Sequence, residues 1–370
     1  MRKLKLQRQK GKVDKRLFYL TLILVIIGLI AVTDASFYSA LRSFSDKFYF
    51  AKQQAGWALI GIILMIIFSY VDYKIWERLA IPFFAIAILL LIAVLIPGLG
   101  ASAQGAKRWL VVGSFISIQP SEIVKLSLSV YFAKLASKEK NAKAFFIPLA
   151  LVCGLIMLQP DLGTTMVLAG IGLVQIFISG IGLLSMLLAF LSAGAAGIVL
   201  ILISDYRKDR LLTFLQSARD PLGKSYHIRQ ILIALGSGGL FGVGIGQSKQ
   251  KYLFLPEAAT DSIFAVIAEE VGFLGSSLLI MLFMLYIYFS LNIVKKAPDM
   301  FSKMLSSGIV VWIGGQAFVN IASMLSIVPL TGIPLPFISY GGSSLVTVLV
   351  ATGILLNISR HVKYEKQKKR

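Results

Sequence analysis

The stretch KQKYLFLPEAATDSIFAVIAEEVGFLG, residues 249–275, marks where a polar loop of this chain passes into an apolar helix. It holds four acidic residues within 14 positions, in a chain with only 17 acidic residues against 37 basic ones: Glu257, Asp261, Glu269 and Glu270. Carboxylates beside a long apolar segment are costly and usually serve a function. Asp261, at the start of the helix, is therefore a candidate functional residue. A structural alternative is open, because Thr260 or Asp261 would also suit the N-cap of the helix.

The composition around this stretch is that of a membrane protein. Hydrophobic residues make up 57% of the 370 residues and charged residues 15%, and the mean hydropathy is +0.82. Soluble domains carry about 25% charged residues. We therefore expect an all-α, polytopic integral membrane protein with about ten transmembrane helices. The apolar runs lie near residues 17–37, 55–71, 79–97, 120–136, 144–160, 162–180, 181–203, 272–294, 304–327 and 341–359.

The distribution of Lys and Arg predicts how the chain is oriented. With the N-terminus inside, the cytoplasmic segments hold 23 basic residues and the short outer loops hold five. Basic residues are enriched on the cytoplasmic side, so we expect both termini there. A large extracytoplasmic loop, residues 204–261, then lies between helices 7 and 8. The chain divides into a basic tail (1–16), one transmembrane domain (17–360) and a second basic tail (361–370).

Charge and composition also exclude several classes of function. The net charge is +20, but the basic tails flank membrane spans, so anionic lipid headgroups are expected as partners and nucleic acid is not. The first span is long and lacks a small-residue cleavage site, which indicates a retained anchor. The single cysteine, Cys153, excludes an internal disulfide. His227 and His361 are too far apart in sequence to suggest a His-based metal site, and no phosphate-binding loop indicates ATP as the energy source.

One of the outer loops carries candidate anion-binding residues. Residues 98–119 contain Lys107 and Arg108 beside Trp109, which suits either anchoring at the membrane interface or binding of a sugar diphosphate. A further outer loop, residues 326–344, contains three prolines. Because proline cannot complete backbone hydrogen bonding, we expect this loop to be non-helical and to lie over protein or a cavity. All three outer loops are expected on one face.

The large loop, residues 204–261, combines basic and apolar residues with a glycine-rich run. Arg207 and Arg210 lie among leucines, a pattern typical of short helices at the membrane interface. The run ALGSGGLFGVGIG, residues 234–246, would let the backbone approach a ligand closely or would serve only as turns. It does not indicate dinucleotide binding, because no βαβ pattern surrounds it.

Polar residues also occur inside the expected spans. Glu122 and Lys125 are three residues apart at the start of the fourth span, hence on one helix face, and an ion pair is expected because an isolated charge would be costly there. Whether this pair is structural or faces a substrate is left open. Asp161, with Thr164 three residues later, is expected to begin a helix as its cap.

Seven ordered motifs identify a family that the chain resembles from about residue 17 to residue 360. The combination resembles the SEDS family, the FtsW, RodA and SpoVE proteins of bacterial shape, elongation, division and sporulation. The motifs are KRWL (107–110), QPSE (119–122), QPDLGT (159–164), DPLG (220–223), ALGSGGLFGVG (234–244), LPEAATDSIFAVIAEE (255–270) and GIPLPFISYGGSS (332–344). The segment FYFAKQQAGWALIG (48–61) and the Gly-Val-Gly-Ile-Gly-Gln run are closer to the FtsW type than to RodA.

The chain departs from the family at its most informative motif. The family pattern is His-Thr-Asp followed by Phe, whereas this chain has Ala259, Thr260, Asp261 and Ser262. The aspartate is kept, and the imidazole and the aromatic ring are absent. A mechanism that requires that histidine is therefore in doubt for this chain.

The resemblance implies a peptidoglycan glycosyltransferase that polymerises lipid II on the outer face of the bacterial cytoplasmic membrane. It also implies a class B penicillin-binding protein that crosslinks the product, with other divisome or elongasome membrane proteins as partners. The catalytic aspartate of the family falls on Asp261, which suits a general base. No cofactor is expected with certainty, and a divalent cation is left open. Candidate substrate-binding residues are Lys107, Arg108, Trp109, Glu122, Lys125, Arg207 and Arg210.

Two other functions are compatible with the same composition. A flippase for the lipid-linked precursor would also use broken segments and charges inside the membrane. Against it, the sequence has no convincing inverted repeat, few charges at mid-span, and polar motifs clustered on one face. A non-enzymatic scaffold that recruits a transpeptidase would have no need of an acid at Asp261.

Overall fold

The computed structural model describes residues 11–103, 106–112, 116–138, 141–188 and 226–362, together with the single positions 191 and 194. Most of the expected span 181–203 lies outside the described residues. So do Arg207, Arg210 and the outermost parts of both basic tails.

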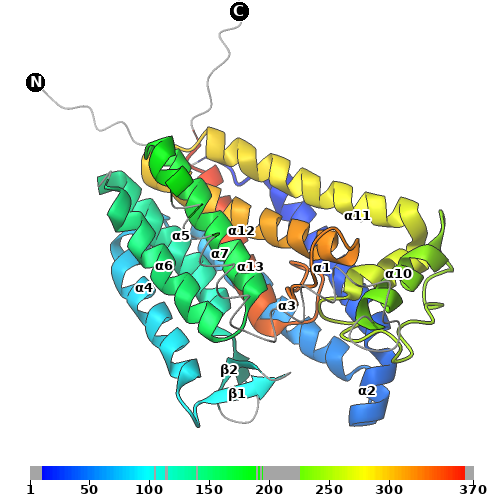
Figure 1. The fold of residues 1–370 in the computed structure, drawn as a ribbon. Helices are drawn as coiled ribbons and strands as arrows, with labels where there is room; N and C mark the ends of the chain where they lie inside the picture. Colours follow the sequence, from blue (N-terminus) through cyan, green and yellow to red (C-terminus); the bar gives the residue numbers. More distant parts are fainter. Residues whose placement is uncertain are drawn as a thin grey trace, which may run out of the picture.

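Helices dominate the described structure (Figure 1). Their bounds are α1 Lys15–Ala35, α2 Phe37–Phe44, α3 Tyr49–Tyr70, α4 Lys74–Leu95, α5 Pro120–Lys138, α6 Ala142–Leu158, α7 Leu162–Ile178, α10 Tyr226–Gly238, α11 Ile263–Lys295, α12 Met300–Met324 and α13 Gly342–Ser359. Six of them, α1, α3, α4, α11, α12 and α13, are long and apolar enough to cross a membrane, and α6 and α7 are shorter apolar helices. The chain is a multi-pass membrane protein, while the count of ten spans stays a prediction.

The expectation of an all-α fold is wrong for the segment between α4 and α5. This segment forms a three-stranded antiparallel sheet in the order β1 Gly100–Ala103, β2 Ala106–Val112 and β3 Ile116–Ile118. The register pairs Trp109 with Ala101 and Leu110 with Ile118. A loop that leaves the helical body must still pair its backbone groups, and two short antiparallel ladders do so locally. The sheet lies at one end of the helical body (Figure 1).

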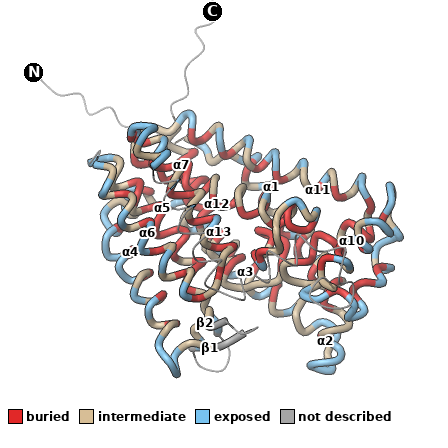
Figure 2. The backbone as a smooth tube through the Cα atoms, in the orientation of Figure 1, coloured by how far each residue is buried: buried red, intermediate tan, exposed pale blue. Residues whose placement is uncertain are grey.

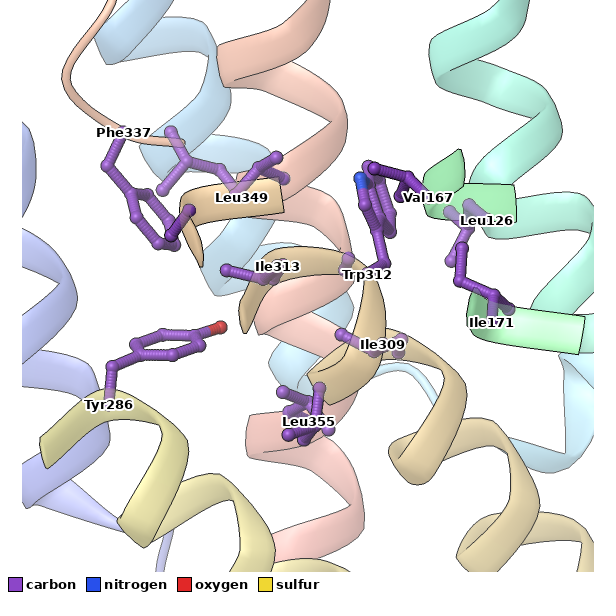
Figure 3. Packing of buried hydrophobic residues seen from close by; sticks show 14 of the residues in the cluster. Leu126, Val167, Ile171, Tyr286, Ile309, Trp312, Ile313, Phe337, Leu349 and Leu355 are labelled. Carbon is purple, nitrogen blue, oxygen red and sulfur yellow. The ribbon is translucent and has the colours of Figure 1, made fainter. Parts of the chain in front are cut away.

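The core lies around α12 and α13. Of their most apolar stretches, 67% and 78% of the residues are buried, against 22% for α3 and 28% for α4. Figure 2 shows exposed residues along the outer faces of α4 and α11 and buried residues between the inner helices. Trp312 of α12 is fully buried, and Figure 3 shows it beside Val167 of α7 and Leu126 of α5, with Leu349 of α13 on its other side. Exposed apolar faces on the outer helices are expected where lipid replaces water as the solvent.

Turns and chain ends collect at two opposite ends of the helical body. At one end the first described residues meet the end of α13, where the Gly11 amide donates to the Arg360 carbonyl at 2.8 Å. The same end holds Tyr73, between α3 and α4, whose hydroxyl donates to the Asp299 carboxylate that caps α12. At the other end the described parts of the three expected outer loops meet. There the Ser343 hydroxyl, at the start of α13, donates to the Ser117 carbonyl of β3 at 2.9 Å.

Candidate functional site

Asp261 directly precedes α11, in the turn that leads into this helix. The N-cap residue is Ser262, whose side chain makes no capping hydrogen bond, so neither Thr260 nor Asp261 is the N-cap. The Asp261 side chain is half-buried, and its Oδ1 accepts a hydrogen bond from the Thr260 hydroxyl at 3.0 Å. The residue is therefore partly exposed.

Asn320 of α12 fixes the backbone of Asp261. Its side-chain amide donates to the Asp261 carbonyl at 2.8 Å and to the Ile333 carbonyl at 2.7 Å, and the residue is 1% exposed. The segment 325–341, which contains no helix, is thereby tied to the start of α11. A β-carbon placed on Gly332 would lie 3.7 Å from Asp261 Oδ2, so this segment passes directly beside the carboxylate.

Two further hydrogen bonds join the same two segments. The Ser339 hydroxyl donates to the Thr260 carbonyl, and the Tyr340 amide donates to the Ala259 carbonyl at 2.9 Å. Ala259 stands where the family has histidine, and it packs against the hydrophobic core without adding an ionisable group. The backbone on both sides of Asp261 is thus held in place while the residue stays partly exposed. Such positioning suits a catalytic group.

Glu122 and Lys125 form the predicted ion pair, and they form it in the interior. The Lys125 ammonium lies 2.7 Å from the Glu122 carboxylate, and both side chains are 1–2% exposed. The ammonium also donates to the Gln316 side-chain carbonyl at 2.8 Å and lies 5.3 Å from the centre of the Trp312 ring. Gln316 in turn donates to the Pro334 carbonyl at 2.9 Å. The pair is therefore connected through α12 to the segment that lies against Asp261.

Arg108 binds the turn between α6 and α7. Its guanidinium donates to the Gln159 carbonyl at 3.2 Å and to the Pro160 carbonyl at 2.6 Å, and its Nε lies 3.9 Å from Asp161 Oδ2. Asp161 caps α7 as expected, accepting from the Thr164 amide at 2.9 Å. One fifth of the Arg108 side chain is exposed. Its charge is thus held at the end of the molecule where the three loops meet.

The other predicted substrate-binding residues are described less fully. Trp109 is half-buried in β2. Lys107 belongs to the same strand, but its side chain lies outside the described part, as do Arg207 and Arg210.

A second cluster of charges surrounds Lys251, in the segment between α10 and α11. Its ammonium lies 2.7 Å from the Asp34 carboxylate at the end of α1 and 3.0 Å from the Glu270 carboxylate in α11. Burial disfavours the charge on Lys251, but the hydrogen bonds that its ammonium donates to Asp34 and Glu270 outweigh this effect and raise the pKa of the lysine. Glu269 accepts from the amides of Lys249 and Gln250 at 3.1 and 3.4 Å. Glu269 and Glu270 thus serve to anchor this segment on α11.

The glycine-rich run approaches another backbone closely. Helix α11 is broken at Gly272, where φ is 67°. The carbonyls of Glu269 and Glu270 accept from the amides of Val243 and Gly244, both at 3.0 Å. Beyond the break, the Phe273 and Leu274 amides donate to the Gly239 and Leu240 carbonyls at 2.9 and 3.1 Å. The run therefore replaces the hydrogen bonds that the break removes from α11.

Several residues that hold the site lie outside the set predicted from the sequence. Asn320, Gln316 and Ser339 anchor the segments around Asp261, and each is buried. Their side chains could have indicated such a role in the sequence, because Gln316 and Asn320 are amides inside a largely apolar span. Among the described residues, no group of three or more His, Cys, Asp or Glu is arranged to hold a metal ion.

Sequence and structure comparisons identify close relatives of this architecture. The chain is 42% identical over 364 residues to stage V sporulation protein E of Bacillus subtilis, covering 96% of this chain and 99% of that protein. It is 38% identical over 358 residues to a "probable peptidoglycan glycosyltransferase FtsW" of Trichlorobacter lovleyi, covering 95% and 94%.

Solved structures share the fold over nearly the whole chain. A chain from a study of how a peptidoglycan synthase complex coordinates polymerization and crosslinking has a TM-score of 0.76, with 26% identity and coverage of 94% of this chain and 98% of that one. The crystal structure of the rod shape determining protein RodA of Thermus thermophilus has a TM-score of 0.70, with 26% identity and coverage of 95% and 98%. Residues 14–364 also match the FtsW, RodA and SpoVE family of cell cycle proteins. The chain belongs to this family.

Proposed function

We propose that the chain is a peptidoglycan glycosyltransferase, which polymerises lipid II on the outer face of the bacterial cytoplasmic membrane. The observation that carries this proposal is the placement of Asp261, a half-buried carboxylate whose backbone is held by Asn320 while its side chain is accessible. Relatives of similar length that bear the name peptidoglycan glycosyltransferase support the reaction class.

The chemistry requires one base and stabilisation of a leaving group. Asp261 accepts the proton of the acceptor hydroxyl, whose oxygen forms a new bond to the anomeric carbon of the donor sugar. The bond from that carbon to the lipid diphosphate breaks, and the diphosphate leaves with the electron pair. Because a diphosphate is a good leaving group, a second carboxyl group is not needed to protonate it.

Basic residues at the same end would stabilise the departing diphosphate. Arg108, fixed on the α6–α7 turn and one fifth exposed, supports this role best among the predicted cations. Lys107, Arg207 and Arg210 are proposed to complete the anion site, and Trp109 to pack beside it. A divalent cation could share this role. Glu122 and Lys125 are proposed to act from the interior, through Gln316, on the position of the Asp261 segment.

The proposed partners follow from the reaction. A polymer of lipid II requires crosslinking, so a class B penicillin-binding protein is proposed to work beside this chain, together with other membrane proteins of the divisome or elongasome. The similarity to a chain from a peptidoglycan synthase complex supports this assembly.

Replacement of Asp261 by Asn tests the proposed function. Asp261→Asn keeps the shape and the hydrogen-bond acceptor but removes the base. Polymerisation of lipid II by the purified protein with its transpeptidase should fall by about two to four orders of magnitude. The matched control is Asp46→Asn, a carboxylate in the α2–α3 turn that pairs with Lys52 at 2.7 Å, and it should retain activity.

Glycan length on gels and thermal stability in detergent are measured together. Near-normal polymerisation by stable Asp261→Asn would refute the assignment of the base. Movement of lipid II across vesicles without polymerisation would instead favour the flippase.

A further inference from the structure

We propose that His227 is a positioning residue for Asp261 and that its imidazole gives this site its dependence on pH. This inference rests on the proposed function, because it takes Asp261 as the base. The contact between His227 and Ser262, from which it is argued, does not depend on that function.

The contact joins the start of α10 to the start of α11. The His227 Nε2 lies 2.8 Å from the Ser262 hydroxyl, which is fully buried. Ser262 is the N-cap residue of α11, and its hydroxyl makes no capping hydrogen bond with the helix. The side-chain oxygen of an N-cap serine usually accepts a hydrogen bond from a backbone amide in the first turn of the helix. Here the hydroxyl is committed to an imidazole from another helix, and α10 packs along α11.

This contact places a titratable group close to the candidate base. Asp261 directly precedes Ser262, and successive Cα atoms are about 3.8 Å apart, so His227 Nε2 lies within about 9 Å of the Asp261 Cα. Histidine has an ordinary pKa of about 6.5 and gains a positive charge below it. Through longer-range attraction between charges, an imidazolium there stabilises the ionised form of Asp261 and makes it a weaker base. Neutral His227 does not, so polymerisation should rise as the pH increases through the His227 pKa.

Other ionisable groups lie on the elements around this contact. Glu257 accepts from the Thr260 hydroxyl at 2.7 Å, beside Asp261. Helix α10 itself adds Tyr226 and Arg229. Helix α11, against which α10 packs, carries Glu269 and Glu270 about two turns from its start, and α12, which also contacts α10, carries only Lys303, in its first turn. The second histidine, His361, follows the far end of α13, an 18-residue helix about 27 Å long. His227 is therefore the histidine that can act on Asp261.

The first test measures the interaction between the charges of His227 and Asp261, and it requires no activity assay. Histidine titrations are followed by NMR in isotope-labelled protein, with His361→Gln used to assign the two signals. If the two groups interact, Asp261→Asn removes a negative charge and should lower the His227 pKa by about one unit. Asp46→Asn should leave it unchanged. An unchanged His227 pKa in stable Asp261→Asn would overturn the proposal, whether or not the protein polymerises lipid II.

The second test compares pH profiles of polymerisation. His227→Gln keeps a hydrogen-bonding side chain but cannot gain charge. It should retain activity at pH 8 within about threefold, and its loss of activity at acidic pH should begin about one pH unit lower than in the parent. Ser262→Ala removes the hydrogen bond and keeps the imidazole, so it should lower kcat by about tenfold at every pH. His361→Gln should match the parent.

The outcomes distinguish the role proposed for His227 from the assignment of Asp261 as the base. A parental pH profile in stable His227→Gln would overturn the role of His227 while leaving the proposed function intact. Full activity of Asp261→Asn would refute the proposed base instead. If His227→Gln does not fold, the coupling measured by NMR in the parent and in Asp261→Asn still decides.

Discussion

The buried Glu122–Lys125 pair shows how single charges are accommodated between the helices of this protein. Two ions removed from solvent are costly, and their attraction repays that cost only where further hydrogen bonds satisfy them. Lys125 has such a bond to Gln316, whereas Glu122 Oε2 has no hydrogen-bond partner among the described residues. The carboxylate is therefore the less well satisfied member of the pair.

Removal of one partner should destabilise the protein more than removal of both. Glu122→Gln leaves a buried ammonium without its counter-ion, and we expect a loss of about 3 kcal/mol in the free energy of unfolding. Addition of Lys125→Met should restore at least half of it. Thermal unfolding in detergent measures the effect.

Activity of the double variant separates stability from function. Because Lys125 also orients Gln316, which holds Pro334, the double variant should be stable but polymerise lipid II more slowly than the parent. A double variant as unstable as Glu122→Gln would contradict the ion-pair argument, and full activity would remove any functional role for the pair.

Residues close in sequence were open to prediction, and contacts between distant residues were not. The spacing of Glu122 and Lys125 places both on one helix face, so their pairing follows from helix geometry. Gln316 is 191 residues from Lys125, and His227 is 35 residues from Ser262. Neither contact leaves a periodic pattern in the sequence, so only the folded arrangement identifies them.

Helix α11 depends on another segment of the chain at its break. At this break, at Gly272, the run around Gly242 supplies the backbone hydrogen bonds. The two backbones lie so close there that neither glycine leaves room for a side chain. A β-carbon on Gly272 would lie 2.3 Å from the Gly242 amide nitrogen, and one on Gly242 would lie 2.1 Å from the Glu270 carbonyl oxygen. Positive φ angles at both positions also favour glycine.

Gly272→Ala should therefore disrupt the contact between α10 and α11. We expect a loss of several kcal/mol in stability, because the clash falls on backbone atoms that cannot move away separately. The matched control is Gly236→Ala in α10, where an added β-carbon meets nothing within 4 Å. This control should be neutral or more stable by up to about 1 kcal/mol. Equal melting temperatures for the two variants would show that the close approach is not needed.

The elements that the sequence did not reveal are those without a clear period. Strand β3 has three residues and β1 has four, too few for an alternating pattern to be recognised. The glycine-rich run indicates that its backbone lies close to something, but the glycines do not identify the partner. The sequence could therefore not distinguish a ligand from α11 as that partner. Long apolar helices such as α4 and α12 were clear from composition alone.

At the scale of the whole molecule, the predicted orientation places the Asp261 end outside the cell. Cysteine labelling tests it after Cys153 is replaced by alanine. Exposed positions at the two ends of the helical body are available: Ser45 and Lys249 at one, and Ser137 and Lys296 at the other. An impermeant maleimide added to intact cells should label cysteines at Ser45 and Lys249 only, because basic residues are retained on the cytoplasmic side. The reverse pattern would place Asp261 away from an extracytoplasmic substrate.

The order of synthesis gives the filled break in α11 a consequence for how the protein enters the membrane. A span with unpaired peptide groups is costly in hydrocarbon, so the groups that a break frees need partners. Here the partner, residues 239–244, leaves the ribosome before α11 does, and it pairs with the groups on both sides of Gly272. Residues 239–244 can therefore pair with α11 before α12 and α13 have been made.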